Sequence, residues 1–173
     1  MSRCIRIIPW LEIKGKNLVK GINMEGLRVL GKPWKFAKAY YQSGIDELIY
    51  VDTVASLYGR NSLTDLIKLT AKELFIPLTV GGGIRSLQDI VFALRAGADK
   101  VCINTAAVED PGFISKASDK FGSQCIVVAI DAKKSKLTNS WEVVTYGGRK
   151  RTGIDAVEWS INAETSGAGE ILI

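Results

Sequence analysis

The chain has 173 residues, of which 47% are hydrophobic and 24% are charged, as in an ordinary globular domain with a sizeable core. No segment approaches the roughly 18 consecutive apolar residues of a membrane span, so we expect no membrane partner. The net charge of +5 suits anionic ligands, and the absence of histidine excludes Ser-His pairs, histidine-ligated zinc and imidazole acid–base catalysis.

The first half of the chain alternates between strand and helix patterns. Apolar runs rich in β-branched residues predict strands, and longer stretches of helical composition predict helices. In chain order we expect a strand at Ile5–Ile13, a helix at Lys32–Ser43, a strand at Glu47–Val51, a helix at Leu63–Leu74, a strand at Leu78–Val80 and a helix at Ser86–Arg95, with Ser86 as its N-cap.

The second half continues the same alternation. We expect a strand at Lys100–Ile103, a helix at Pro111–Phe121, a strand at Cys125–Ile130, a β-hairpin over Lys136–Tyr146, a helix at Ala156–Ser166 and the start of a strand at Glu170–Ile173. Strands and helices that alternate at this spacing predict parallel strands joined by crossover helices.

A weak internal repeat supports this reading. Gly44–Asp52, Gly97–Asn104 and Gly167–Ile173 each begin with a glycine that ends a helix in the left-handed conformation, followed by a charged residue and a buried strand. The pattern fits a closed barrel or an open doubly wound sheet. No G-x-G-x-x-G follows the first strand, which counts against a dinucleotide-binding sheet.

The number of predicted strands suggests an incomplete barrel. We count about six strands, whereas a closed (β/α)8 barrel has eight. Ile173 lies inside an apolar strand, so the simplest interpretation is a truncated α/β TIM barrel, with residues 1–173 as one incomplete domain. A complete smaller sheet is the alternative.

Alternation along the strands gathers polar residues at two ends of this fold. In a parallel barrel, Glu12, Asn104 and Asp131 would meet at the C-terminal mouth. Arg6, Glu47, Lys100 and Glu170 would meet at the opposite end. The latter set is either a structural ring of salt bridges or a gate through which something small passes.

The residues expected at the C-terminal mouth predict acid–base chemistry and anion binding. Glu12 and Asp131 are candidate general acid and base, because barrel enzymes place catalysis at strand C-termini. The alternative is that each is a solvated carboxylate. Gly81–Gly83, before a helix capped by Ser86, lets backbone N–H groups approach a phosphate, although a tight turn explains a glycine run equally well. Asn104 and Thr105 add donors beside it.

The basic residues and the cysteines have unremarkable interpretations. Lys133–Lys136 and Arg149–Arg151 are predicted to be solvated loops rather than a nucleic-acid patch. Cys4, Cys102 and Cys125 include no C-x-x-C pair, which favours free thiols in a reducing cytoplasm. Met1–Arg6 runs into the first strand without the apolar region of a signal peptide.

Several segments resemble the cyclase subunit family of imidazole glycerol phosphate synthase, and they extend from about residue 4 to the last residue. They are Ile7–Lys14, Val19–Gly21, Val80–Ile84, Val101–Glu109, Phe121–Gln124 and Val128–Lys133. The fourth and fifth are fairly specific, and they favour the cyclase over its sister barrel, the isomerase of the preceding histidine-pathway step.

The resemblance implies a TIM barrel that pairs with a glutamine amidotransferase. The partner's ammonia crosses the barrel to cleave and cyclise a phosphorylated substrate, with no cofactor and no metal. The family's two catalytic aspartates fall on Glu12 and Asp131, and its mobile lysine falls on Lys20. Its first phosphate site falls on Gly83, Asn104 and Thr105, with Gly82 adjacent, and its charged gate on Arg6, Glu47, Lys100 and Glu170.

Departures from the family pattern keep other functions open. Glu12 stands where the family has aspartate, and Trp10 replaces a small residue that faces the barrel interior. The stretch expected to carry the second phosphate site is absent. Two alternatives follow: a paralogue that supplies ammonia for sugar amidination in surface-polysaccharide biosynthesis, and a non-catalytic barrel that only docks a partner.

Overall fold

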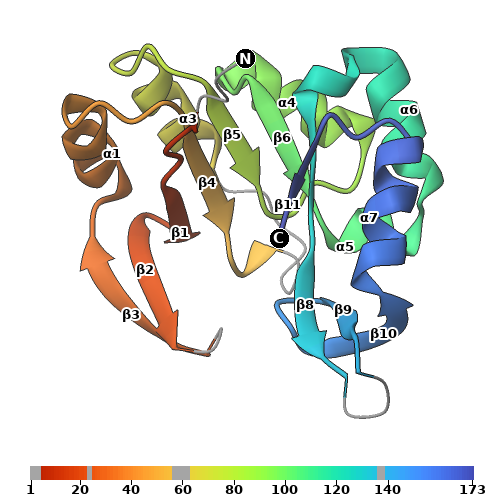
Figure 1. Cartoon of the computed structure of the whole chain (residues 1–173). Helices are drawn as coiled ribbons and strands as arrows, with labels where there is room; N and C mark the ends of the chain where they lie inside the picture. Colours follow the sequence, from red (N-terminus) through yellow and green to blue (C-terminus); the bar gives the residue numbers. More distant parts are fainter. Residues whose placement is uncertain (1–4, 23–24, 56–62, 136–138) are drawn as a thin grey trace.

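The computed structural model describes residues 5–22, 25–55, 63–135 and 139–173. The main sheet has the strand order β11-β7-β6-β5-β4-β1-β2-β3, and a smaller sheet has the order β10-β9-β8. From β11 to β1, six neighbouring strands are parallel. They curl into an open wall with helices on the outer side (Figure 1). This is the arrangement of a (β/α)8 barrel over six of its strands, and it confirms the predicted fold class.

The elements have the following bounds. The parallel strands are β1 (Trp10–Lys14), β4 (Leu48–Asp52), β5 (Leu78–Gly81), β6 (Lys100–Ile103), β7 (Ile126–Ala129) and β11 (Glu170–Leu172). The helices are α1 (Pro33–Gln42), α3 (Thr64–Ala71), α4 (Leu87–Ala96), α5 (Thr105–Glu109), α6 (Gly112–Phe121), the 3-10 turn η1 (Ser123–Cys125) and α7 (Ala156–Thr165). Among the described residues, no helix is long and apolar enough to span a membrane.

The predicted start of the first strand was wrong. β1 begins at Trp10 rather than at Ile5. Pro9 carries no N–H for a strand ladder, and Ile5 and Ile7 are 89% and 65% exposed. The preceding segment still runs beside β4, because Asp46 N–H donates to Ile7 C=O at 3.1 Å and Ile49 N–H donates to Pro9 C=O at 3.0 Å.

Antiparallel excursions follow β1 and β7. The first, β2 (Asn17–Ile22) and β3 (Glu25–Gly31), was not predicted, because glycines and charged residues interrupt its alternation. The second has three strands, β8 (Asp131–Lys134), β9 (Trp141–Thr145) and β10 (Lys150–Asp155). The prediction of a two-stranded hairpin over Lys136–Tyr146 was therefore wrong in its bounds and omitted one strand. Residues 136–138 lie outside the described ranges.

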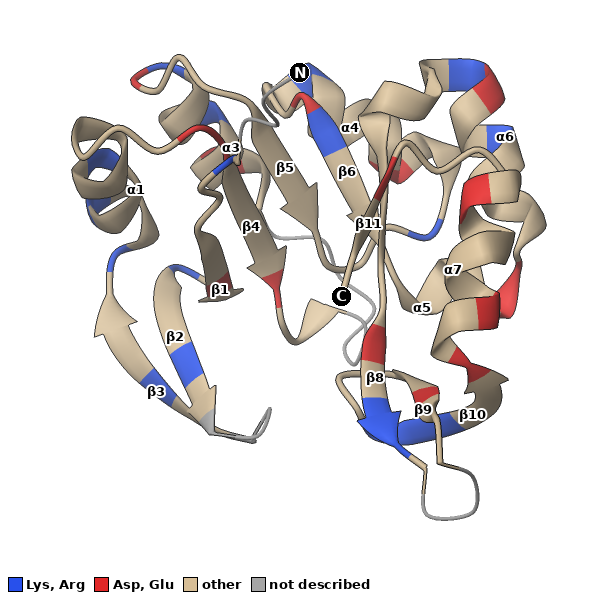
Figure 2. Cartoon of the chain, viewed as in Figure 1, with Lys and Arg blue, Asp and Glu red and all other residues tan. Residues whose placement is uncertain are grey.

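The basic residues of this second excursion lie on strands. Lys133 and Lys134 belong to β8, and Lys150 and Arg151 belong to β10, although a loop was predicted for both groups. Their side chains are exposed, so the solvated part of the prediction holds. Figure 2 shows these cations along β8 and β10, away from the curled wall.

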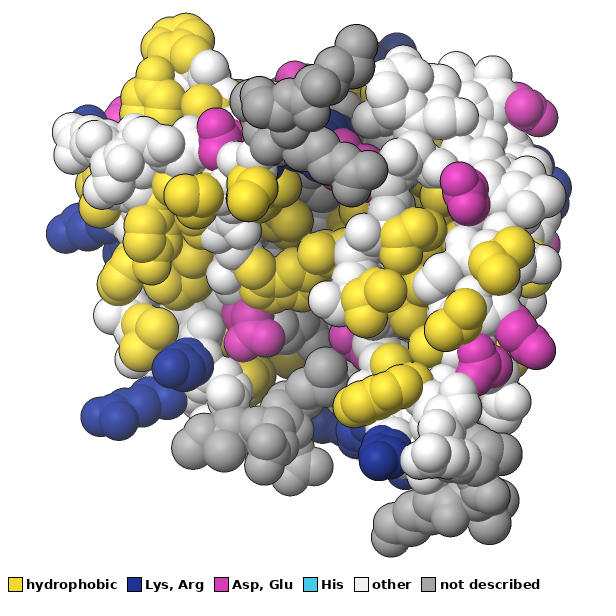
Figure 3. All heavy atoms as spheres, viewed as in Figure 1, with side chains coloured by type: hydrophobic (Ala, Val, Ile, Leu, Met, Phe, Trp, Pro, Cys, Tyr) yellow, Lys and Arg dark blue, Asp and Glu magenta, His cyan; other side chains and the backbone are white. Residues whose placement is uncertain are grey.

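The alternation of side chains along the parallel strands separates two apolar clusters. Leu11, Tyr50 and Val101 belong to the large cluster between sheet and helices. Cys102, Val127 and Ala129 form a small separate cluster, with Leu172 packed against it. Figure 3 shows hydrophobic side chains gathered across the inner face. Side chains on the inner face of the strands do not pack against the helices, so they are available to form a functional surface.

Glycines end the helices as the internal repeat predicts. Gly44, Gly97 and Gly167 have φ of 81°, 114° and 105°, the left-handed region that favours glycine. Ser86 caps α4 in a capping box with Asp89, as predicted for its N-terminus. These turns fix where each following strand enters the sheet.

Gly97→Ala is expected to lower the free energy of unfolding more than Gly44→Ala. Both substitutions put a side chain in the left-handed region, at a cost of about 1–2 kcal/mol. A Cβ at Gly97 would lie 2.6 Å from Ala71 Cβ, whereas a Cβ at Gly44 meets nothing within 4 Å. Urea unfolding should show a further loss of about 1–3 kcal/mol at position 97. Equal losses would contradict tight packing of α4 on α3.

Candidate active site

A cavity of about 500 Å³ lies at the carboxyl ends of the parallel strands. Acidic residues on β1, at the end of β4 and at the start of β8 lie toward this same end of the sheet (Figure 2). The predicted site residues that line it are Glu12, Gly82, Gly83, Asn104, Thr105 and Asp131. Lys20 is exposed on β2 and is not among its lining residues.

Asp131 is the best-defined reactive group of the cavity. It is the first residue of β8, separated from the end of β7 by one residue, and its Oδ2 accepts a hydrogen bond from Asn104 Nδ2 at 2.9 Å. Burial raises the pKa of Asp131, and the opposing effects of the Asn104 hydrogen bond and the Lys133 charge do not cancel it. A carboxyl group with a raised pKa exchanges protons more readily near neutral pH.

The side-chain amide of Asn104 is oriented toward Asp131. One N–H of its amide serves the carboxylate, which fixes the amide with Nδ2 toward Asp131 and Oδ1 away from it. Oδ1 is buried and has no hydrogen-bond partner within the described ranges. A buried acceptor of this kind is satisfied by a ligand N–H or O–H group or by water.

Glu12 lies across the cavity on β1, on the inner face that it shares with Trp10. Its Oε2 accepts a long hydrogen bond of 3.4 Å from the Gly21 N–H, which ties it to β2. Trp10 is 40% exposed and lines the cavity beside it. The two residues expected to depart from the family pattern therefore both line the cavity.

Cys102 lines the cavity between these groups but is a poor nucleophile. Burial, and to a smaller degree the negative charge of Asp131, raises the pKa of its thiol to about 12. The thiol is therefore protonated at neutral pH. Cys102 and Cys125 are both free, as predicted, whereas Cys4 lies outside the described ranges.

Gly82 has a structural reason to be glycine. A Cβ there would lie 2.3 Å from the backbone oxygen of Asp52, and its φ is 91°. The tight-turn interpretation of the glycine run therefore accounts for this residue. A phosphate contact at Gly82 and Gly83 stays a prediction.

Arg85, Glu109 and Tyr146 also line the cavity, and sequence reasoning missed all three. The position of Arg85, just after the glycine run, was a usable signal. Tyr146 reaches the cavity from the turn between β9 and β10, 41 residues from the Thr105 that it contacts. No local pattern could have found it.

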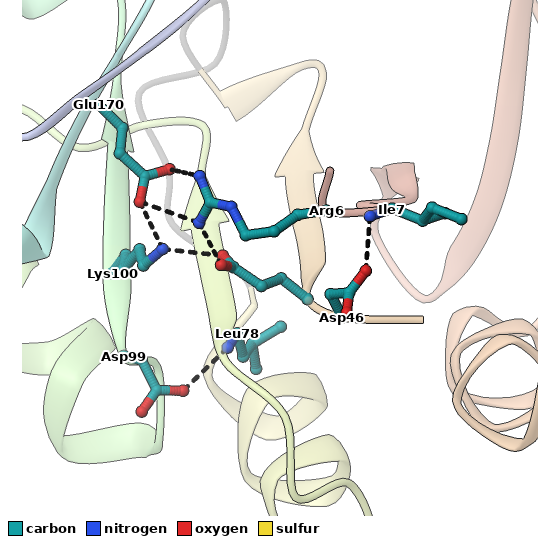
Figure 4. Close-up of polar contacts among 8 residues, drawn as sticks. Arg6, Ile7, Asp46, Leu78, Asp99, Lys100 and Glu170 are labelled. Atoms are coloured by element: carbon teal, nitrogen blue, oxygen red, sulfur yellow. Dashed lines mark hydrogen bonds and ion pairs between the residues drawn. The ribbon is translucent and has the colours of Figure 1, made fainter. Parts of the chain in front are cut away.

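The four charged residues predicted for the opposite end do meet there. Lys100 Nζ lies 2.8 Å from Glu47 Oε2 and 2.7 Å from Glu170 Oε1. Arg6 pairs with Glu47 and lies 3.4 Å from Glu170. Arg6, Lys100 and Glu170 point toward one another in Figure 4. The structure thus contains a salt-bridge cluster, and its role as a gate stays a prediction.

Mutual pairing favours the ionised forms of Lys100 and Glu170. Burial alone would lower the pKa of Lys100, but its bonds to Glu170 and Glu47 outweigh burial and raise it. Burial alone would raise the pKa of Glu170, but Lys100 and Arg6 outweigh burial and lower it. The Glu47 side chain is only 8% exposed and forms ion pairs with both cations.

Lys100→Met is expected to lower the free energy of unfolding by about 2 kcal/mol, because it leaves Glu47 with Arg6 as its only cation in the cluster. Lys38→Met is the matched control. Lys38 pairs with Glu73 on the surface, where the side chains are 50% and 43% exposed, so a loss below about 1 kcal/mol is expected. Similar losses in urea unfolding for the two variants would show that Lys100 contributes no more to stability than a surface ion pair does.

Similarity to known proteins extends over nearly the whole chain. The family model described as "Histidine biosynthesis protein" matches residues 6–173. The chain is 57% identical over 169 residues to the imidazole glycerol phosphate synthase subunit HisF of Legionella pneumophila, which covers 98% of the chain and 79% of the relative. It is 51% identical over 168 residues to the HisF subunits of two Dehalococcoides mccartyi strains, BAV1 and CBDB1, which covers 97% of the chain and 66% of each relative.

The chain thus spans about two thirds of the length of the Dehalococcoides relatives and a larger share of the Legionella relative. Both the match to the family model and these identities extend over nearly all of the chain. The resemblance inferred from the motifs is therefore confirmed, and the chain belongs to the histidine biosynthesis protein family.

Proposed function

We propose that the chain carries the cyclase activity of imidazole glycerol phosphate synthase. This ammonia-dependent lyase/cyclase forms imidazole glycerol phosphate and aminoimidazole carboxamide ribonucleotide in histidine biosynthesis. The observation that carries the proposal is that Glu12 and Asp131 line one cavity, together with the glycine run and Thr105. Relatives that carry the name of this enzyme, at 51% and 57% identity, support it.

The two carboxylates have complementary tasks. Joining ammonia to the substrate requires removal of a proton from the incoming nitrogen, and cleavage requires a proton for the leaving group. Asp131, with its raised pKa, can either accept or donate a proton, and the hydrogen bond from Asn104 fixes the orientation of its carboxylate. Glu12 supplies the second group from β1. Its extra methylene shifts the reactive oxygen relative to an aspartate.

The phosphorylated substrate would be held at the Thr105 end of the cavity. Gly82, Gly83, Asn104 and Thr105 would contact its phosphate, and Lys20 would reach over it from β2. All but Lys20 line the cavity in the structure, and the hairpin that carries Lys20 contacts Glu12 through Gly21.

The ammonia would come from a glutamine amidotransferase at the opposite end of the wall. There Arg6, Glu47, Lys100 and Glu170 would form the gate. Lys100 begins β6, the strand that carries Cys102 on its inner face and leads to Asn104 at the cavity. The free thiols of Cys102 and Cys125 fit a cytoplasmic location.

Trp10 and Glu12 favour one alternative substrate class. Both line the cavity, so a bulkier wall and a longer carboxylate face the ligand directly. This observation favours the paralogue that supplies ammonia for sugar amidination. A barrel that only docks a partner is the remaining alternative.

Turnover with ammonium salts distinguishes these functions. The histidine-pathway substrate, phosphoribulosyl-formimino aminoimidazole carboxamide ribonucleotide, should be tested with the chain itself and with a chimaera. The chimaera continues from Ile173 with the C-terminal part of the Legionella relative. Turnover by the chimaera is the expected result. Lack of turnover together with stimulation of a glutaminase would favour docking.

Asp131→Asn is expected to abolish turnover while the substrate still binds, because the amide cannot exchange the proton. Substrate binding should be measured by calorimetry beside the activity assay. Asp119→Asn, on α6 and remote from the cavity lining, is the matched control and should keep full activity. Retained turnover in the Asp131 variant would remove that residue from the acid–base assignment.

The same substitution is expected to raise the melting temperature at pH 8. Since the folded-state pKa of Asp131 is raised, ionisation opposes folding at high pH. That penalty fades as the pH falls through the raised pKa toward the ordinary aspartate value near 4. The advantage of asparagine should therefore shrink on acidification, and an advantage independent of pH would contradict the pKa direction.

Glu12→Asp is expected to raise turnover of the histidine-pathway substrate, by up to about a hundredfold, if the longer side chain misplaces the carboxylate by about 1 Å. Steady-state kinetics of the chimaera measures the change. Glu12→Gln is the control, and it should be inactive. Equal rates for the glutamate, aspartate and glutamine forms would remove Glu12 from the mechanism.

A further inference from the structure

The turn between β9 and β10 is bound to two residues that line the cavity and to one residue of β8. Tyr146 N–H donates to Thr105 Oγ1 at 3.2 Å, and the Tyr146 hydroxyl donates to Glu109 Oε1 at 2.7 Å. Lys133 Nζ donates to Gly148 C=O at 2.8 Å. Both contacts of Tyr146 are to α5, the helix that follows the inner strand β6.

Tyr146 holds an unusual backbone conformation to make these contacts. Its φ is 54°, and within the described ranges it is the single non-glycine residue with a positive φ. For a bulky aromatic residue this conformation is strained. It persists only where the surroundings impose it, and the phenol bond to Glu109 is the most direct restraint on the side chain.

The contact with Thr105 has a consequence for the hydroxyl group. Because the oxygen accepts the Tyr146 N–H, one lone pair is occupied and the oxygen is fixed in place. The hydroxyl hydrogen remains to be donated, and it has no protein acceptor within the described ranges. Thr105 lines the cavity together with Tyr146, Gly82 and Gly83, so that hydrogen can be donated to a ligand there.

We propose that Tyr146 is a positioning residue for the phosphate end of the cavity. Its backbone N–H orients the Thr105 hydroxyl as a donor to a phosphate oxygen, and its phenol anchors the turn on Glu109. The inference rests on the proposed function, because it acts through Thr105. Tyr146 itself need not touch the substrate.

Glu109 provides a test that separates anchoring from charge. A carboxylate near an anion site weakens anion binding by repulsion, so loss of its charge alone should tighten binding. Glu109→Gln removes the charge and keeps an acceptor for the phenol. Glu109→Ala removes both the charge and the anchor. A positioning role therefore predicts opposite shifts for the two variants.

The measurement is calorimetric binding of inorganic phosphate to the chain. Thr105→Val should weaken binding about tenfold, as expected when a hydrogen bond to a charged ligand is lost. Tyr146→Phe and Glu109→Ala should each weaken it severalfold, and neither should weaken it further in a Thr105→Val background. Glu109→Gln should bind at least as tightly as the parent. Tyr40→Phe, on the exposed face of α1, is the tyrosine control and should change nothing.

The outcomes separate the inference from the function on which it rests. Unchanged binding in Tyr146→Phe and Glu109→Ala, beside weakened binding in Thr105→Val, overturns the inference alone. Losses that add to that of Thr105→Val also overturn it, since the turn would then act independently of the hydroxyl. Parent-like binding by Thr105→Val overturns the phosphate assignment and the inference together.

Discussion

The alternation of side chains along six parallel strands is the constraint on which the rest of this structure depends. One set of positions packs against the helices, where Leu11, Tyr50 and Val101 are almost fully buried. The other set faces inward and is free of that packing. Since all six strands run in one direction, inner residues near their carboxyl ends gather around one cavity, and inner residues near their amino ends gather at the opposite end. Both groups of polar residues follow from this single geometric rule.

Buried charges are compensated differently at the amino and carboxyl ends of the parallel strands. At the amino end, two cations and two carboxylates neutralise one another. The pKa values of Arg6 and Lys100 are raised and that of Glu170 is lowered, so each shift favours the ionised form. At the carboxyl end, Asp131 receives a neutral amide as its hydrogen-bond partner, and burial raises its pKa. A paired charge contributes to the fold, whereas an incompletely compensated carboxylate is available for proton transfer. This contrast favours chemistry at the cavity and a supporting or gating role for the cluster.

The sequence predicted the parts of the fold that depend on local pattern. Helices α1, α4, α6 and α7 lie within a residue or two of their expected bounds, because caps and glycines mark their ends. Both antiparallel excursions were misjudged, because exposed strands such as Lys150–Asp155 have no buried face to impose alternation. Parity identified Glu12, Asn104 and Asp131. It could not find Tyr146, which is brought to Thr105 by tertiary structure, nor that Lys20 lies outside the cavity lining.

Trp10 can serve as an intrinsic fluorescent probe of the cavity. Its indole lines the cavity and is 40% exposed, whereas Trp159 is 4% exposed in the core between sheet and helices. Emission from Trp10 should therefore respond when the cavity fills, and emission from Trp159 should respond to loss of the core. Once the other two tryptophans, Trp34 and Trp141, are replaced by phenylalanine, occupancy of the cavity and integrity of the fold can be followed through Trp10 and Trp159 in one unlabelled sample.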